Sequence, residues 1–183
     1  MYHKYLTDEL FFKFLYQTDQ DLALKTKEKG CRLCGSKLHV ANYVRKPRGC
    51  TGLSDDYSLR FSFCCAREGC RSRALPASIR FCGRVVYWSV HMVLISAMVN
   101  GRSPELAKIM SEFNVDIKTI KRWRRWWADF FPTTKFWKKL KAEFIEEVEH
   151  FPLGLLILFQ QNSSENDAII KLLHLLNGLK EPI

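Results

Sequence analysis

The sequence lacks several features that mark particular classes of protein. It contains no internal repeat and no low-complexity run, which argues against solenoids and disordered linkers. Its longest uncharged stretch, residues 85–101, is shorter than the roughly 20 apolar residues of a membrane-spanning helix and includes polar side chains such as Ser89, His91 and Asn100. We therefore expect no membrane partner, and we predict that residues 85–101 form a buried core helix with His91 as a core histidine.

The chain also lacks the cysteine usage of a secreted protein. Its 7 cysteines cannot all pair, and Met1 leads directly into polar and charged residues rather than into a signal peptide. We therefore expect a cytoplasmic protein with reduced thiols. Cys50 and Cys82 have no partner at ligand spacing and are predicted to be ordinary small residues.

Two other cysteine pairs have the spacing of metal ligands. Cys31 and Cys34 are separated by two residues, so both sulfurs can face one ion, and Gly35 can adopt the positive φ of a tight turn. The second pair combines Cys70 with either Cys65 or Cys64.

Strand alternation favours Cys65 over Cys64. In residues 61–65 a period of two places Phe61, Phe63 and Cys65 on one face. The predicted ligands are therefore Cys31, Cys34, Cys65 and Cys70, and Cys64 in place of Cys65 remains the alternative.

The segment between the cysteine pairs has the composition of a β-hairpin. Residues 38–44 and 57–63 are predicted strands around a glycine- and proline-containing loop, an arrangement typical of a zinc ribbon. Four thiolates leave no open coordination position, so Zn²⁺ is predicted to be structural. A redox dithiol at Cys31 and Cys34 is less favoured, because such motifs open a helix in a βαβ context that is absent here.

Acidic side chains are scarce in the two regions that carry the candidate motifs. The formal net charge is +10, with Lys+Arg 29 and Asp+Glu 19, and the excess lies in residues 31–84 and 102–141, whereas residues 142–183 are acidic. Concentrated positive charge indicates a polyanion-binding surface, with improved solubility as the simpler alternative.

Residues 103–131 have the pattern of a helix-turn-helix. Ser103 and Pro104 predict a helix start, Asn114 a left-handed turn and Asp116 the cap of a second helix over residues 117–131. The apolar positions with the spacing that locks such a unit are Ile109, Phe113, Val115, Ile120 and Trp123.

The second helix of this unit is the predicted recognition helix for duplex DNA. Arg122 is the candidate for reading a guanine, because its guanidinium can bond O6 and N7 together. The predicted DNA-contacting residues are Lys118, Thr119, Lys121, Arg122 and Arg125, joined by Arg71 and Arg73 after the ribbon and by Lys135 and Lys138 in a predicted helix over residues 134–149. The aromatic residues Trp123, Trp126, Trp127, Phe130, Phe131, Phe136 and Trp137 are assigned to the core.

The remaining segments complete a mainly α fold with a small β zinc ribbon, of the α+β class. We predict two short N-terminal helices over residues 8–16 and 19–27, capped by Thr7 and Thr18. Apolar C-terminal helices over residues 152–160 and 166–176 either close the core or form a homodimer. The predicted division is a helical platform at 1–30, the ribbon at 31–75, a helical domain at 76–131 and C-terminal helices at 132–183.

The motif Cys31-x-x-Cys34-Gly35, the pair Cys64-Cys65 with Cys70-Arg71, and residues 119–123 together support a family comparison. Over about residues 31–127 the chain resembles the zinc-ribbon and helix-turn-helix front end of bacterial insertion-sequence transposases, and small accessory proteins of mobile elements. The resemblance implies a bacterial, nucleoid-associated protein that binds element-end or promoter DNA, with a transposase or integrase encoded nearby as a possible partner. Such transposases continue into a catalytic domain with separated carboxylates, for which no room remains here.

The primary hypothesis is a zinc-stabilised DNA-binding protein that is not an enzyme. An RNA-binding ribbon protein is one alternative, and it is expected to expose aromatic side chains for stacking. A protein-interaction adaptor that uses the apolar C-terminal helices is the other.

Overall fold

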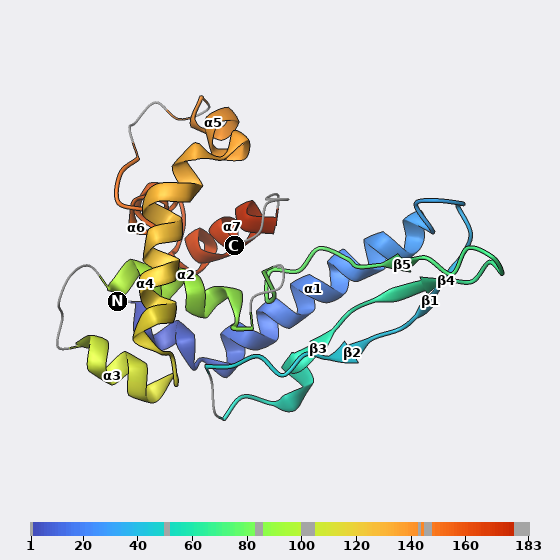
Figure 1. The fold of residues 1–183 in the computed structure, drawn as a ribbon, viewed down its shortest axis with the longest axis horizontal. Coiled ribbons are helices and arrows are strands. Elements are labelled where there is room, and N and C mark those ends of the chain that lie inside the picture. The colour runs from blue at the N-terminus through green and yellow to red at the C-terminus, as the bar shows by residue number, and fades with distance from the viewer. Residues whose placement is uncertain are drawn as a thin grey trace.

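The structure, a computed structural model, describes residues 2–49, 52–82, 86–99, 105–142, 144 and 148–177. Helices dominate and the strands are short, as expected for a mainly α member of the α+β class. Figure 1 shows a long helix, α1 (Glu9–Lys29), with the strands beside it at one end of the molecule and the other helices gathered at the opposite end.

The N-terminal segment forms one long helix rather than two short ones. After a 3-10 turn, η1 (Tyr2–Leu6), the side chain of Asp8 caps α1 by accepting hydrogen bonds from the amides of Leu10 and Phe11. The predicted break is therefore wrong, and so are the predicted caps at Thr7 and Thr18. The Thr18 hydroxyl instead donates to Phe14 O inside the helix, and Asp19 continues the helix because its carboxylate has buried partners.

The predicted hairpin is present but divided into two small sheets. Its elements are β1 (Leu38–Val40), β2 (Tyr43–Val44), the 3-10 turn η2 (Asp55–Ser58), β3 (Leu59–Arg60), β4 (Phe63–Cys65) and β5 (Arg73–Ala74). The antiparallel sheets have the orders β1-β4-β5 and β2-β3. At the division, the amide of Ser62 donates to the side-chain oxygen of Asn42 at 3.0 Å instead of to a strand partner. Tyr57, predicted to begin a strand, lies in η2.

The opposite end is built from helices. In chain order they are α2 (Ser89–Met98), α3 (Glu105–Glu112), α4 (Ile117–Arg125), a π-helical turn η3 (Trp126–Phe130), a 3-10 turn η4 (Phe131–Thr133), α5 (Lys135–Lys141), α6 (Leu153–Gln160) and α7 (Glu165–Asn177). Helix α2 is the predicted core helix, although it is shorter than predicted because residues 86–88 and 99 lie outside it. His91 on it is fully buried, with Nε2 3.0 Å from Leu6 O. Within the described ranges, no helix combines the length and apolar character needed to cross a membrane.

Two predicted helices end earlier than expected. The helix predicted over residues 134–149 is reduced to α5, and Glu149 lies outside any helix; residues 143 and 145–147 lie outside the described residues. The α4 helix gives way at Trp126 to the π-helical turn, in which the amide of Phe131 bonds Trp126 O, and Pro132 then lies in η4. The predicted helix start at Ser103 and Pro104 also lies outside the described residues.

The larger core occupies the helical end and includes the aromatic cluster. Trp123, Trp126, Trp127, Phe131 and Trp137 are buried as predicted, whereas Phe136 is half-buried and Phe130 is 40% exposed. The C-terminal helices contribute Leu155, Leu156, Ile169, Leu172, Leu173 and Leu176 to the same core. These helices therefore close the core of their own chain, and the homodimer remains a prediction.

A buried ion pair joins the middle of α1 to the strand region. The Arg80 Nε donates to Asp19 Oδ2 at 2.8 Å, and both side chains are fully buried. Asp19 also accepts hydrogen bonds from the Ser78 hydroxyl and the Ile79 amide, while the Arg80 guanidinium donates to the carbonyls of Tyr57 and Leu59. Such complete hydrogen bonding is what allows two charges to lie in a protein interior.

Candidate metal centre and basic helix

The first cysteine pair lies in a tight turn directly after α1. Gly30, with φ 70°, ends the helix, and the amide of Gly35, with φ 71°, donates to Cys31 O at 2.7 Å. The amide of Cys31 donates to Ser36 O at 2.9 Å and closes the turn. Both glycines adopt a backbone conformation that other residues rarely take, so the chain folds back and turns Cys31 and Cys34 toward one point.

The second pair lies in a matching turn at the end of β4. Cys65 is the last residue of that strand, and the following turn passes through Gly69 at φ 81° before Cys70. The amide of Arg67 points at Cys65 Sγ, 3.4 Å away. Cys64 lies on the other face of the strand, where its sulfur is 3.5 Å from Arg71 O. Strand alternation therefore selects Cys65, and Cys64 stays outside the cluster.

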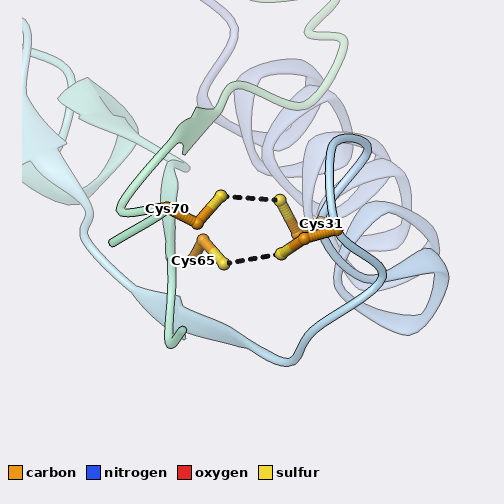
Figure 2. Close-up of side chains that lie close together, drawn as sticks. Cys31, Cys65 and Cys70 are labelled. Atoms are coloured by element: carbon orange, nitrogen blue, oxygen red, sulfur yellow. Dashed lines mark hydrogen bonds between the residues drawn. The ribbon is translucent and has the colours of Figure 1, made fainter. Parts of the chain in front are cut away.

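The four sulfur atoms form a compact group. All lie within 4.8 Å of one another, with Cys31 and Cys70 3.8 Å apart and Cys34 and Cys65 3.4 Å apart. Figure 2 shows the two turns facing each other with their sulfurs between them. A tetrahedral ion with Zn–S bonds of about 2.3 Å separates its sulfurs by about 3.8 Å. The cluster could therefore hold a metal ion of that size with little adjustment.

The polar surroundings of the thiols differ strongly. Hydrogen bonds from the Ser72 hydroxyl and from the amides of Leu33 and Cys34 lower the pKa of Cys31 to about 6. The hydroxyl and amide of Ser36 lower the pKa of Cys34, whereas burial raises the pKa of Cys65 to about 12. The first turn is therefore prepared to present thiolate, whereas Cys65 needs a cation nearby to lose its proton.

Helix α4 carries the largest group of predicted DNA-contacting residues. The Asp116 side chain caps it by accepting the amide of Lys118 at 2.7 Å, and Asn114 before it has φ 46°. Ile120 and Trp123 are buried against the core. Lys118, Lys121, Arg122 and Arg125 are exposed, and Thr119 is half-buried. One face of α4 is thus fixed by packing while the other presents cations to solvent.

Two of the other predicted DNA-contacting residues, Arg71 and Arg73, lie far from this surface. Arg71 and Arg73 are exposed beside the cysteine cluster, with the Arg73 guanidinium 5.7 Å from the centre of the Tyr43 ring. In Figure 1 this region and α4 lie at opposite ends of the long axis of the molecule. Lys135 and Lys138 are exposed on α5, which follows α4 in the chain. The basic residues therefore form two separate regions.

Two features of this arrangement were not predicted from the sequence. The first is Asp19, which lies at helical spacing on the same side of α1 as the buried Phe12, Leu15 and Ala23. If residues 9–29 are treated as one helix, this spacing places an acidic residue on the apolar side, where it needs a buried partner. The second is Arg124, the one cation of α4 with no predicted role, which borders a cleft beside that helix.

No family of proteins, no curated protein and no solved structure matches this chain.

Proposed function

We propose that this chain is a double-stranded DNA-binding protein stabilised by a structural zinc ion, with no catalytic activity of its own. The observation that carries the proposal is the exposed cationic face of α4, which is backed by buried Ile120 and Trp123. A rigid helix with cations along its outer face is the usual element that proteins insert into the major groove.

The local geometry around α4 supports a helix-turn-helix. Helix α3 is followed by a turn at Asn114 and by α4, and the side chains between them, Ile109, Phe113, Val115, Ile120 and Trp123, are all buried. In this interpretation Arg122 reads a guanine edge, and Lys118, Lys121 and Arg125 contact phosphates. Thr119, which is half-buried, borders this surface.

Zinc at the four cysteines would order the small sheets rather than take part in chemistry. Closed thiolate coordination leaves no position for a substrate. Arg71 and Arg73 beside it, and Lys135 and Lys138 on α5, would contact phosphates farther along the duplex. Regulation of, or assistance to, a transposase or integrase of a bacterial mobile element is the biological role we propose, on the motif resemblance alone.

Burial of aromatic and aliphatic side chains weighs against the two alternatives. Binding of single-stranded RNA uses exposed rings for stacking, whereas most of the tryptophan cluster is buried. An adaptor using the C-terminal helices would need their apolar side chains at the surface, yet Leu172, Leu173 and Leu176 lie in the core and Ile157 alone is exposed among the described large apolar residues of α6 and α7. Duplex DNA fits the exposed surface better.

The test is to titrate the metal-loaded chain with duplex DNA, single strands and RNA at several salt concentrations. We expect tight duplex binding that weakens with salt, with a slope of about −0.9 for each phosphate contact. Arg122→Ala should cost about 1–3 kcal/mol and relax preference at one base pair, whereas Lys118→Ala should weaken all sequences equally. Lys171→Ala, a charge change at an exposed position of α7, is the matched control. A preference for single strands or RNA, or binding without salt dependence, contradicts the proposal.

A further inference from the structure

A cleft of about 670 Å³ lies beside the C-terminal half of α4. Lys121, Arg124 and Arg125 line one wall, and the segment that precedes α6 forms the opposite wall. This volume lies within the range of about 300–1,000 Å³ found for small-molecule sites.

The three cations of the cleft are neighbours on one side of α4. Successive residues of a helix are about 100° apart, so Lys121 lies beside Arg124 and Arg125, which are one turn away. Arg122 and Arg124 are about 200° apart and therefore lie on opposite sides of the helix. All three side chains of the cleft wall are exposed. Within the part of the chain that the structure describes, none of the three forms an ion pair or a side-chain hydrogen bond. The cleft therefore offers an anion three positive charges that no ion pair engages among the described residues.

The π-helical turn shapes this cleft. It begins directly after Arg125, and its wider spacing is seen in the bond from the Phe131 amide to Trp126 O. Ala128, within the turn, lines the cleft with only a methyl group. Single π-helical turns occur frequently at functional sites, because they displace side chains from the regular helical positions.

The remaining lining residues suit a ligand that carries neutral polar groups in addition to its anionic group. Asp129 and Glu149 also border the cleft, and Glu149 lies 3.8 Å from His150 Nε2. These carboxylates repel a second anion but accept hydrogen bonds from hydroxyl or amino groups. The half-buried ring of Phe151 adds an apolar surface.

We propose that this cleft binds a nucleotide, whose phosphate is held by Lys121, Arg124 and Arg125 and whose hydroxyl or amino groups face Asp129 and Glu149. Arginine and lysine are the side chains that most often bind phosphate, and arginine does so with paired hydrogen bonds. This site shares Lys121 and Arg125 with the proposed duplex contact and goes beyond it through Arg124 and the rest of the cleft lining. The nucleotide is either free in solution or part of a strand bound by the same protein.

The test is calorimetric titration of the full metal-loaded chain with the nucleoside 5′-monophosphates, with inorganic phosphate and with the corresponding nucleosides. We expect at least one monophosphate to bind more tightly than phosphate, and the nucleosides to bind far more weakly. Arg124→Ala should weaken that binding about tenfold or more, because it removes charge-assisted hydrogen bonds. Arg122→Ala removes the same charge from the opposite flank and should change it by less than about twofold.

A second variant tests the cleft without altering its charge. Ala128→Leu should fill the space and abolish monophosphate binding, with circular dichroism to verify that the helices are retained. The proposal is overturned if no monophosphate binds, if a nucleoside binds as tightly as its monophosphate, or if Arg122→Ala and Arg124→Ala cause equal losses.

A single-stranded oligonucleotide identifies the source of the nucleotide, because duplex DNA is expected to displace a bound monophosphate from the shared Lys121 and Arg125 in either case. Oligonucleotide binding that weakens in Arg124→Ala supports a nucleotide within a strand, and oligonucleotide binding that Arg124→Ala leaves unchanged supports a free nucleotide. If only the nucleotide site is wrong, the chain still binds duplex DNA and Arg122→Ala still weakens that binding. If only the proposed function is wrong, the chain still binds a monophosphate and Arg124→Ala still weakens that binding. The two outcomes are therefore distinguishable.

Discussion

At the end of the molecule that carries the cysteines, the buried core consists of Ala23, Leu38, Phe61 and Phe63 together with Cys31 and Cys65, whereas the helical end buries many large aromatic and aliphatic side chains. The strands of the cysteine end are two or three residues long. Such short strands around so small a core supply little burial to offset their conformational entropy. We therefore expect the cysteine end to depend on cross-linking by the proposed metal, whereas the helical end has a large core of its own.

The proposed DNA recognition and the proposed metal binding therefore lie at different ends of the molecule, although their motifs follow one another in the sequence. The residue proposed to read a base, Arg122, lies at the end with the large core, and the proposed metal lies at the end with the small core. The connection between them is α1 and the Asp19–Arg80 ion pair at its middle. Each of the following predictions perturbs one end, or the connection, and asks whether the other responds.

Removing the metal is expected to have the largest effect. Structural zinc contributes an apparent 10–16 kcal/mol or so to the folding of small zinc domains. Cys31→Ser, or a chelator, should therefore unfold the strand region and abolish hydrogen-exchange protection in β1 and β4, while α2 and α4 remain protected. Exchange followed by mass spectrometry or NMR measures both regions at once.

Cys64→Ser is the matched control for this experiment, because Cys64 adjoins the cluster without contributing to it. It should retain stoichiometric metal and native protection. If Cys31→Ser also unfolded α2 and α4, or if it left the metal content unchanged, the contrast between a cross-linked end and a packed end would be wrong.

Breaking the buried ion pair is expected to have the next largest effect. Asp19→Asn leaves the Arg80 guanidinium fully buried without its counter-charge, which typically costs about 3–5 kcal/mol. Chemical denaturation should show this loss, and hydrogen exchange should increase on both sides of the connection. Asp21→Asn, at an exposed position of the same helix, should change the free energy of unfolding by less than about 0.5 kcal/mol.

If hydrogen exchange in Asp19→Asn increased only at the cysteine end, the ion pair would stabilise that end alone and would not connect the two ends. Replacing both partners by apolar residues of similar size gives a further comparison, because such exchanges are often neutral or stabilising. Equal losses in the single and the double variant would show that packing, rather than an uncompensated charge, accounts for the effect.

Local patterns predicted much of each end, and long-range contacts account for what they missed. Strand alternation identified Cys65, and the cap at Asp116, the turn at Asn114 and the buried stripe of α4 follow from neighbouring residues. The break predicted before Asp19 is wrong because Thr18 does not cap a new helix: its hydroxyl donates to Phe14 O inside α1, and Asp19 is compensated by Arg80, far away in sequence. Arg124 borders the cleft only because the segment at Glu149 folds back onto α4, and no local pattern indicates that contact.

Acid should affect the helical end through His91, with a smaller effect than that of Asp19. Burial lowers the pKa of His91 to about 4, below its ordinary value of 6.5. Between these pH values the unfolded chain binds a proton that the folded chain does not, so stability is lost as pH falls from 6.5 to about 4. The loss approaches about 3 kcal/mol, because each pKa unit corresponds to about 1.4 kcal/mol.

Substituting His91 by Gln isolates this contribution. A glutamine can still donate a hydrogen bond to Leu6 O but does not titrate, so its free energy of unfolding should vary less with pH over that window. The control is His39→Gln, at an exposed position of β1, which should leave the pH dependence as it is. Acid would also protonate the cysteines of the proposed zinc site and release the ion. The measurement must therefore follow the helical end alone, through the exchange protection of α2 amides or the near-ultraviolet circular dichroism of the buried tryptophans. An unchanged pH dependence in His91→Gln would mean that acid reaches the helical end through the cysteine cluster, and that the two ends are not separately stabilised.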